Sequence, residues 1–302
     1  MTRTLRLIAP GKINWSLEVL RIRPDRYHEI RSVLQTIALH DVITITATDN
    51  GEVTLDIKGD AGMLPDNPLD QNLAYRAAIA LRARVRTGSG AHIVLEKHVP
   101  VAAGLGGGSS DAAVVLRALN DLWAAGQPLE NLIEIAGEIG SDPPFFVVGG
   151  TAVASGRGDA VEALPDANAP SIMLAIPPAG ERGEKTALMF DALTPDHFAE
   201  GYVTIGVQET VQAGRMIHDD LLNNAFEHVT SKMQPDTERA MDALRAEGYV
   251  PHLCGAGPSF FLLYGGGADY ADVLARRLRE TGFEAQPTYA LRRDQSLRVE
   301  EL

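Results

Sequence analysis

The chain has 302 residues and a formal net charge of −13, from 40 acidic and 27 basic side chains. This excess of acid argues against nucleic acid as a partner, because phosphate backbones are bound by clustered Lys and Arg. We find no apolar run of the roughly 18 residues that a membrane span needs, and no long apolar leader at the N-terminus. Its single cysteine, Cys254, excludes an internal disulfide. We therefore expect a cytoplasmic protein with no membrane partner.

The first half of the chain mixes the period-two pattern of strands with the 3.6-residue period of helices. Alternation of apolar residues predicts strands over residues 4–10, 12–22, 42–48, 52–57 and 92–99. The helical period predicts helices over residues 72–85, 109–125 and 128–140. The apolar segment 145–156 has the composition of a strand pair or of one bent strand.

A stretch rich in Pro, Asp and Asn at residues 162–170 predicts a domain boundary, with one domain over 1–163 and a second over 164–302. Beyond it the patterns predict strands over residues 171–177, 259–265 and 283–291, and helices over 184–193, 235–247 and 268–281. Strands and helices alternate without a strict βαβ rhythm, which favours an α+β fold over a doubly wound α/β fold.

The segment "PVAAGLGGGSSDAA" (100–113) places a glycine-rich loop between a predicted strand and a predicted helix. A helix N-terminus binds anions through its free N–H groups and its dipole, and glycines let the backbone approach a phosphate. The loop lacks the lysine of a Walker motif, and Ser109 stands where a dinucleotide fingerprint needs its last glycine. A flexible turn capped by Ser109 is the alternative. The serines and the glycine density favour a phosphate loop.

Four further motifs accompany the loop: "PGKIN" (10–14), "YHEI" (27–30), "GSDPPFF" (140–146) and "CGAGPS" (254–259). Together the five motifs resemble those of the GHMP family of small-molecule kinases, over roughly residues 6–263. The resemblance implies a two-domain α+β fold, with an S5-like N-terminal domain that binds ATP and a ferredoxin-like C-terminal domain. It also implies transfer of the γ-phosphoryl group of ATP, with Mg²⁺, to a hydroxyl group of a substrate bound between the domains. Pro143 and Trp15 depart slightly from the usual motifs.

The same resemblance implies a role for individual residues. Lys12 and Asp142 match the catalytic pair, in which the aspartate accepts or orients the hydroxyl proton beside a lysine that offsets charge. The residues that match ATP-binding positions are Asn72, Lys97, Pro100, Val101, Ala102, Ala103, Gly104, Leu105, Gly106, Gly107, Gly108, Ser109 and Ser110. Ser110 is also a candidate Mg²⁺ ligand. The residues that match substrate-binding positions are Asn14, Tyr27, His28, Thr186, Phe190, Gly255 and Gly257.

Tyr27 and His28 match a pair that recognises cytosine, so the expected substrate is a small molecule that carries cytidine diphosphate. Each of these residues also has a plain structural interpretation: an aspartate before proline is common in turns, and strand lysines are commonly exposed. Another GHMP kinase, for homoserine, mevalonate or a sugar, is the nearest alternative, and a nucleotide-binding protein without catalysis is a second. A dehydrogenase is disfavoured by the failed fingerprint, and a zinc site at His252 and Cys254 by the lack of a second ligand pair. We expect a monomer or a weak homodimer.

Overall fold

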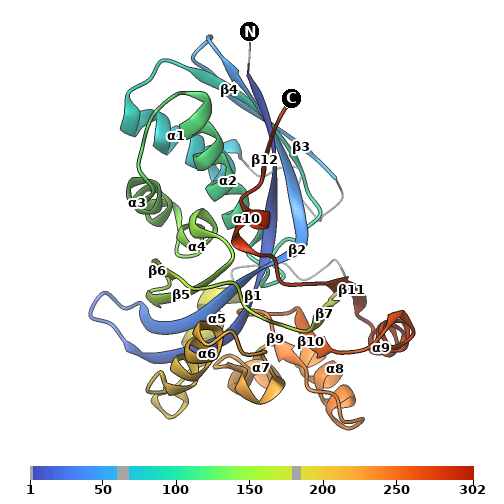
Figure 1. Ribbon diagram of the computed structural model, residues 1–302. Coiled ribbons are helices and arrows are strands. Elements are labelled where there is room, and N and C mark those ends of the chain that lie inside the picture. The colour runs from blue at the N-terminus through green and yellow to red at the C-terminus, as the bar shows by residue number, and fades with distance from the viewer. Residues whose placement is uncertain (1–2, 60–67, 179–184) are drawn as a thin grey trace.

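The computed structural model describes residues 3–59, 68–178 and 185–302, which form two β-sheets with helices packed against them (Figure 1). The first sheet is built around a long antiparallel hairpin, β1 (Thr4–Ile22) and β2 (His28–Thr48). Its strand order is β12-β1-β2-β4-β3, and β5, β6 and β8 extend it. β3 (Val53–Lys58) runs parallel to β4 (Gly90–Glu96).

The hairpin is longer than the alternation pattern predicts. β1 continues through both predicted segments as one strand, and its pairing with β2 shifts register between Pro10 and Lys12 and between Asn14 and Ser16. Such bulges bend a strand and increase its twist. The bend hides the continuity from a period-two count, and it places Lys12 and Asn14 at the irregular part of the strand.

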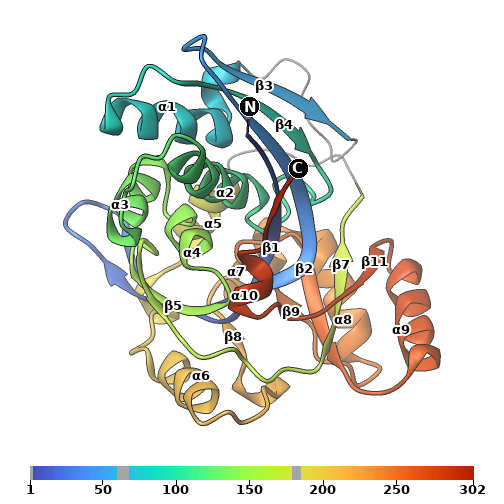
Figure 2. The ribbon, with the colours of Figure 1, turned by 45° about the horizontal axis from the view of Figure 1, so that its top comes forward.

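Helices of the first half cover one face of this sheet (Figures 1 and 2). They are α1 (Leu73–Val85), α2 (Gly107–Leu122), α3 (Leu129–Ile139) and α4 (Pro143–Val148), with a short 3-10 turn at Leu69–Gln71 before them. The apolar faces of α1, α2 and α3 share one buried core with the inner residues of β1, β2 and β4. The first three helices are thus confirmed to within a few residues.

The strand prediction for 145–156 is wrong in its first half, because residues 143–148 form α4 and only β5 (Thr151–Gly156) is a strand there. Pro143 and Pro144 occupy the first helical positions, where the missing N–H costs nothing and the fixed φ suits a helix. All six residues of α4 are buried, so neither periodicity is visible in its sequence. β5 pairs with β2 and with β6 (Ala160–Ala163).

The second sheet is antiparallel, with strand order β11-β7-β10-β9. Its strands are β7 (Ser171–Ile176), β9 (His252–Leu253), β10 (Phe260–Tyr264) and β11 (Glu284–Thr288). The helices of this half are α5 (Lys185–Ala192), α6 (Tyr202–Gln212), α7 (Glu227–Met233), α8 (Pro235–Arg245), α9 (Ala268–Glu280) and α10 (Arg293–Ser296), with 3-10 turns at Pro195–His197 and Asp219–Leu221. The predicted α5, α8 and α9 are confirmed, except that residue 184 lies outside the described residues. α6 and α7 have no counterpart among the predicted elements.

Two strands from the second half return to the first sheet. β8 (Asn223–Asn224) pairs in parallel with Ser16 and Leu17 of β1, and β12 (Val299–Glu301) pairs with β1 at Leu5–Leu7. The α+β class is therefore confirmed. The domain boundary at 163/164 stays a prediction, because the first sheet contains strands from both sides of this boundary. Within the described residues, no helix is long and apolar enough to cross a membrane.

Candidate active site

A cavity of about 980 Å³ lies where β1, β2, the glycine-rich loop, α5 and the start of α7 meet. Most of the residues predicted for the site line it. From the predicted set these are Lys12, Asn14, Tyr27, His28, Asn72, Lys97, Pro100, Val101, Ala102, Ala103, Gly104, Gly106, Gly107, Gly108, Ser109, Asp142, Thr186, Phe190 and Gly255. Segments from seven separate parts of the chain thus meet at one cavity.

The glycine-rich loop is fixed at both of its sides before α2 begins. Lys12 N–H of β1 donates to the Leu105 carbonyl at 2.8 Å, and Ser259 N–H donates to the Ala103 carbonyl at 3.3 Å. Gly104 has φ +80°, and a Cβ built on it would lie 2.0 Å from the Cys254 carbonyl oxygen. Only glycine can take this conformation so close to another backbone segment. The loop is therefore held rigidly between β1 and the 254–259 turn.

Two residues of the predicted loop do not line the cavity. Leu105 is fully buried in the core. Ser110 is also fully buried, and its Oγ has no hydrogen-bond partner among the described residues. Ser109, which is half-buried, lines the cavity one residue earlier in α2. The predicted roles of Leu105 in ATP binding and of Ser110 as a phosphate or Mg²⁺ ligand thus stay predictions, and Ser109 is the better placed serine.

Behind the loop lies a buried group of three charges that sequence reasoning did not identify. Lys97 Nζ donates to Asp111 Oδ2 at 2.7 Å and also to Asp41, and Asp41 Oδ1 accepts the N–H groups of His98 and Val99. Burial raises the pKa of Asp111 to about 7, as does the neighbouring Asp41, while Lys97 opposes this shift. A lysine between two acids is a plain structural pairing, so Lys97 as an adenine-binding residue stays a prediction. Sequence spacing could not bring Asp41 to it.

Asn72, the other residue predicted for the adenine pocket, begins α1. Its Oδ1 accepts the N–H of Ala74 at 2.9 Å and that of Tyr75 at 3.4 Å, which is an ordinary helix cap. The residue lines the cavity as well.

Lys12, on β1, and Asp142, the residue that precedes α4, both line the cavity. Lys12 is almost fully buried, and its Nζ donates to Asn14 Oδ1 at 2.9 Å. Asn14 Nδ2 in turn donates to Ser32 Oγ at 2.8 Å. In the described part of the chain Lys12 and Asp142 form no ion pair within 4.0 Å, so their direct contact stays a prediction.

The other end of the cavity is aromatic. The His28 ring stacks on Phe190, with centroids 4.9 Å apart and planes at 20°, and Phe226 meets Phe190 edge-on at 4.8 Å. Tyr27 is 53% exposed, and the Arg157 guanidinium lies 5.6 Å from its ring centroid. Burial lowers the pKa of His28 below its ordinary value, which favours the neutral ring. Arg157 and Phe226 also line the cavity, and the motifs do not point to either of them.

The two glycines predicted from the "GAGPS" motif differ. Gly255 lines the cavity, and a Cβ built on it would lie 2.6 Å from Lys12 Nζ. Gly257 lies outside the cavity lining, and its Cβ position faces Gln234 Oε1 at 2.4 Å. Gly257 therefore shapes the turn, and its predicted contact with substrate stays a prediction.

Comparisons with known proteins agree with this geometry. Residues 72–150, which contain the glycine-rich loop and Asp142, match the model of the GHMP kinases N terminal domain. A 4-diphosphocytidyl-2-C-methyl-D-erythritol kinase of Dehalococcoides mccartyi is 36% identical over 260 residues, which cover 86% of this chain and 89% of the relative. The enzyme of the same name from Brevibacillus brevis is 39% identical over 257 residues, 84% of this chain and 86% of the relative.

Solved structures show the same fold. The crystal structure of a 4-(cytidine 5'-diphospho)-2C-methyl-D-erythritol kinase has a TM-score of 0.75 and 30% identity, and it covers 94% of this chain and 98% of its own. A homoserine kinase from Cytophaga hutchinsonii has a TM-score of 0.73 at 16% identity, over 99% and 97% of the two chains. The homoserine kinase supports only the fold. Fold and loop are thus those of the small-molecule kinases that the GHMP domain defines.

Within that class, the two kinases and the first crystal structure are each at least 30% identical to this chain, and the matches cover most of both chains. The chain belongs to the 4-diphosphocytidyl-2-C-methyl-D-erythritol kinase family of the GHMP kinases.

Proposed function

We propose that the protein transfers the γ-phosphoryl group of ATP to the 2-hydroxyl of 4-diphosphocytidyl-2-C-methyl-D-erythritol, giving the 2-phosphate and ADP. This reaction would serve isoprenoid precursor biosynthesis by the non-mevalonate route. One observation carries the proposal: a single cavity joins a phosphate-type loop at a helix N-terminus, a lysine and an aspartate, and an aromatic end formed by His28 and Phe190.

The protein need not form a covalent bond to the substrates, because catalysis of phosphoryl transfer depends on positioning and charge stabilisation. Asp142 would accept the proton of the attacking hydroxyl as the new oxygen–phosphorus bond forms. The bond from the γ-phosphorus to the bridging oxygen breaks, and ADP leaves. Lys12 Nζ, held by Asn14, would stabilise the negative charge on the transferred group.

ATP would lie with its phosphates at the start of α2, near Gly106, Gly107, Gly108 and Ser109. Mg²⁺ would enter bound to the ATP phosphates, where it neutralises their charge. Among the described residues no group of three or more His, Cys, Asp or Glu side chains is arranged to hold a metal ion. Of the two serines at the start of α2, Ser109 is the candidate Mg²⁺ ligand that lines the cavity.

The aromatic end distinguishes this substrate from those of other GHMP kinases. A cytosine ring can stack on an aromatic side chain, and Tyr27, His28 and Phe190 all line the cavity, with Arg157 over the Tyr27 ring. Homoserine and mevalonate carry no ring for these residues to bind. Thr186, exposed at the first turn of α5, also faces this end of the cavity. The predicted cytoplasmic location and monomeric or weakly dimeric state are part of the proposal.

The test is ADP formation from MgATP with a panel of alcohols. We expect turnover with 4-diphosphocytidyl-2-C-methyl-D-erythritol, and little with homoserine, mevalonate or a simple sugar. Turnover only with one of the other alcohols would replace the proposed substrate. ATP binding without ADP release under any of these conditions would favour a non-catalytic nucleotide-binding protein.

A further inference from the structure

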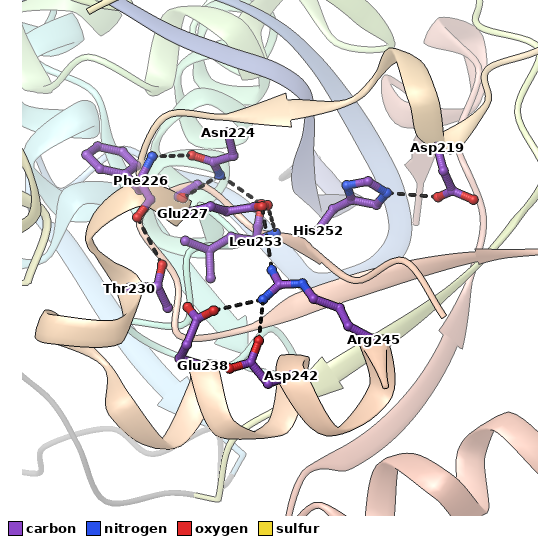
Figure 3. Close-up of polar contacts among 11 residues, drawn as sticks. Asp219, Asn224, Phe226, Glu227, Thr230, Glu238, Asp242, Arg245, His252 and Leu253 are labelled. Atoms are coloured by element: carbon purple, nitrogen blue, oxygen red, sulfur yellow. Dashed lines mark hydrogen bonds and ion pairs between the residues drawn. The ribbon is translucent and has the colours of Figure 1, made fainter. Parts of the chain in front are cut away.

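Asn224 lies outside the five motifs of the sequence analysis, yet its side-chain amide makes three hydrogen bonds to the backbone. It is 4% exposed and sits on β8. Its Nδ2 donates to the carbonyl oxygens of Leu253 at 2.9 Å and Gly255 at 2.8 Å, and its Oδ1 accepts Phe226 N–H at 3.0 Å (Figure 3). A buried amide with this many partners fixes the segments that it joins.

The segment that Asn224 holds is the turn beside the catalytic lysine. Gly255 and Ala256 line the cavity, and the Cβ position of Gly255 lies 2.6 Å from Lys12 Nζ. The carbonyl of Ala256 is held from the other side by Gln234 Nε2 at 2.7 Å. In the described part of the chain, the N–H groups of Gly255 and Ala256 have no hydrogen-bond partner. The turn therefore keeps its acceptors occupied by side chains and leaves two donors free at the cavity.

Asn224 is also fixed with respect to Lys12 through the sheet. It pairs with Leu17 of β1, and Ala225 N–H donates to the Leu17 carbonyl at 2.8 Å. Lys12 and Asn14 lie on the same strand. On its other side Asn224 holds the N–H of Phe226, whose ring contacts Phe190 at the aromatic end. One side chain thus connects the reacting end of the cavity with the end that would bind the base.

We propose that Asn224 is a positioning residue for phosphoryl transfer, one that holds the Gly255–Ala256 turn in place so that its free N–H groups and Lys12 face the same anionic group of the substrates. Without the two amide donors, the Leu253 and Gly255 carbonyls lose their partners and the turn can rotate. A carbonyl turned toward the cavity would repel phosphate oxygens. A displacement of about 1 Å at a reacting centre can cost about 10²-fold in rate. This inference rests on the proposed function.

The experiment compares Asn224→Ala and Asn224→Asp with the wild type, using MgATP and 4-diphosphocytidyl-2-C-methyl-D-erythritol. We expect kcat to fall by about 10²-fold, while the KM for ATP changes little because the α2 loop contacts are intact. The matched control is Thr230→Val. Thr230 Oγ1 donates to the Phe226 carbonyl at 2.9 Å in the same cluster, so this change removes a neighbouring buried hydrogen bond and leaves the turn held. It should keep near wild-type kcat.

The proposal is overturned if folded Asn224 variants lose less than about tenfold in kcat, or if Thr230→Val loses as much as they do. A second measurement uses only the wild type and decides the question if the variants do not fold. Amide hydrogen exchange at Gly255 and Ala256 should slow when 4-diphosphocytidyl-2-C-methyl-D-erythritol and a non-hydrolysable ATP analogue are bound, and unchanged exchange would contradict the proposal. Wild-type protein that forms no ADP from this alcohol would instead count against the proposed function.

Discussion

Asp142 is the residue on which the proposed chemistry depends most directly. Asp142→Asn keeps the shape of the side chain but removes the charge and the basicity that would accept the hydroxyl proton. A positioned general base is worth about 10²–10⁴-fold, so we expect kcat to fall by that factor while both dissociation constants stay near their wild-type values. Steady-state kinetics with a calorimetric binding control measures both.

The matched control for this variant is Asp191→Asn, because Asp191 is another carboxylate of the cavity lining but lies on α5 at the aromatic end. Its kcat should change far less. If Asp142→Asn retains more than about a third of the wild-type kcat, a loss too small for a base, Asp142 only shapes the turn before α4.

Phe190, which the sequence predicts to bind substrate, stacks on His28 at the aromatic end of the cavity. Phe190→Ala should raise the KM for the cytidine substrate by about tenfold or more, since stacking of a base on an aromatic ring contributes about 1–3 kcal/mol. The KM for ATP should stay unchanged, because the α2 loop lies at the other end of the cavity. Equal effects on both KM values would mean that Phe190 only supports the fold.

At the scale of the element, the N-terminus of α2 is the predicted phosphate site. Gly106 is a poor probe of it, because Gly106 has φ +72° and an added Cβ would lie 2.9 Å from the Phe146 ring. Outside its own helix, the nearest described atom to the Cβ position of Gly108 is Leu73 Cδ1 at 3.8 Å, and Gly108 lines the cavity. Gly108→Val should therefore fold normally and weaken ATP binding by at least about tenfold, as calorimetry would show.

Gly206→Val provides the control for this loop variant. Gly206 lies within α6, and nothing lies within 4 Å of its Cβ position, so the same β-branched residue enters a helix away from the cavity. ATP affinity should not change. Wild-type affinity in folded Gly108→Val would mean that the phosphates do not bind at the start of α2.

The charged group behind the loop makes stability depend on pH. In the folded state burial raises the pKa of Asp111 to about 7 from its ordinary value of 3.8. Between these two values the folded carboxyl holds a proton that the unfolded chain has released, so the contribution of Asp111 to stability falls as pH rises. Asp111→Asn removes this titration. Its free energy of unfolding relative to wild type should therefore increase from about pH 5 to about pH 7.5 in urea titrations. A difference that does not vary with pH would show that Asp111 is ionised in the folded state throughout.

At the scale of the whole molecule, the Arg293 side chain adds to the β12–β1 pairing that joins the C-terminal segment to the rest of the fold. The Arg293 guanidinium donates to the carbonyls of Thr151 and Leu164 at 2.8 Å and to that of Gly149 at 3.3 Å. Arg293 is therefore part of the folded structure and not a solvated tail residue. Hydrogen bonds from a charged group contribute about 1.5–3 kcal/mol each when buried, so Arg293→Ala should lower the free energy of unfolding by about 2 kcal/mol or more.

Arg292→Ala is the companion variant, because Arg292 is exposed and, among the described residues, its side chain hydrogen-bonds only within its own short helix. It should leave stability within about 0.5 kcal/mol of wild type. Chemical denaturation of both variants decides between the two roles. Equal losses, or no loss at Arg293, would show that the contacts of Arg293 do not stabilise the fold.

The sequence alone determined the local features that short-range chemistry dictates. The glycine-rich loop before α2 was predictable because glycine conformation and helix polarity act over a few residues. The helices α1, α3, α8 and α9 were predictable because each has one apolar face. The family was predictable because five motifs, including those around Lys12 and Asp142, occur in one order along the chain.

Only the tertiary structure decided how these pieces meet. The buried α4 shows no periodicity in its sequence, and the bulges of β1 break the alternation that would reveal one long strand. Asp41, which holds Lys97, lies 56 residues from it, and Asn224 lies 31 residues from the Gly255 carbonyl that it binds. No local pattern encodes such contacts, because a side chain's partners are set by packing of distant segments. The same packing placed Ser109 at the cavity and buried Ser110 beside it, a difference that their adjacent positions in the sequence do not show.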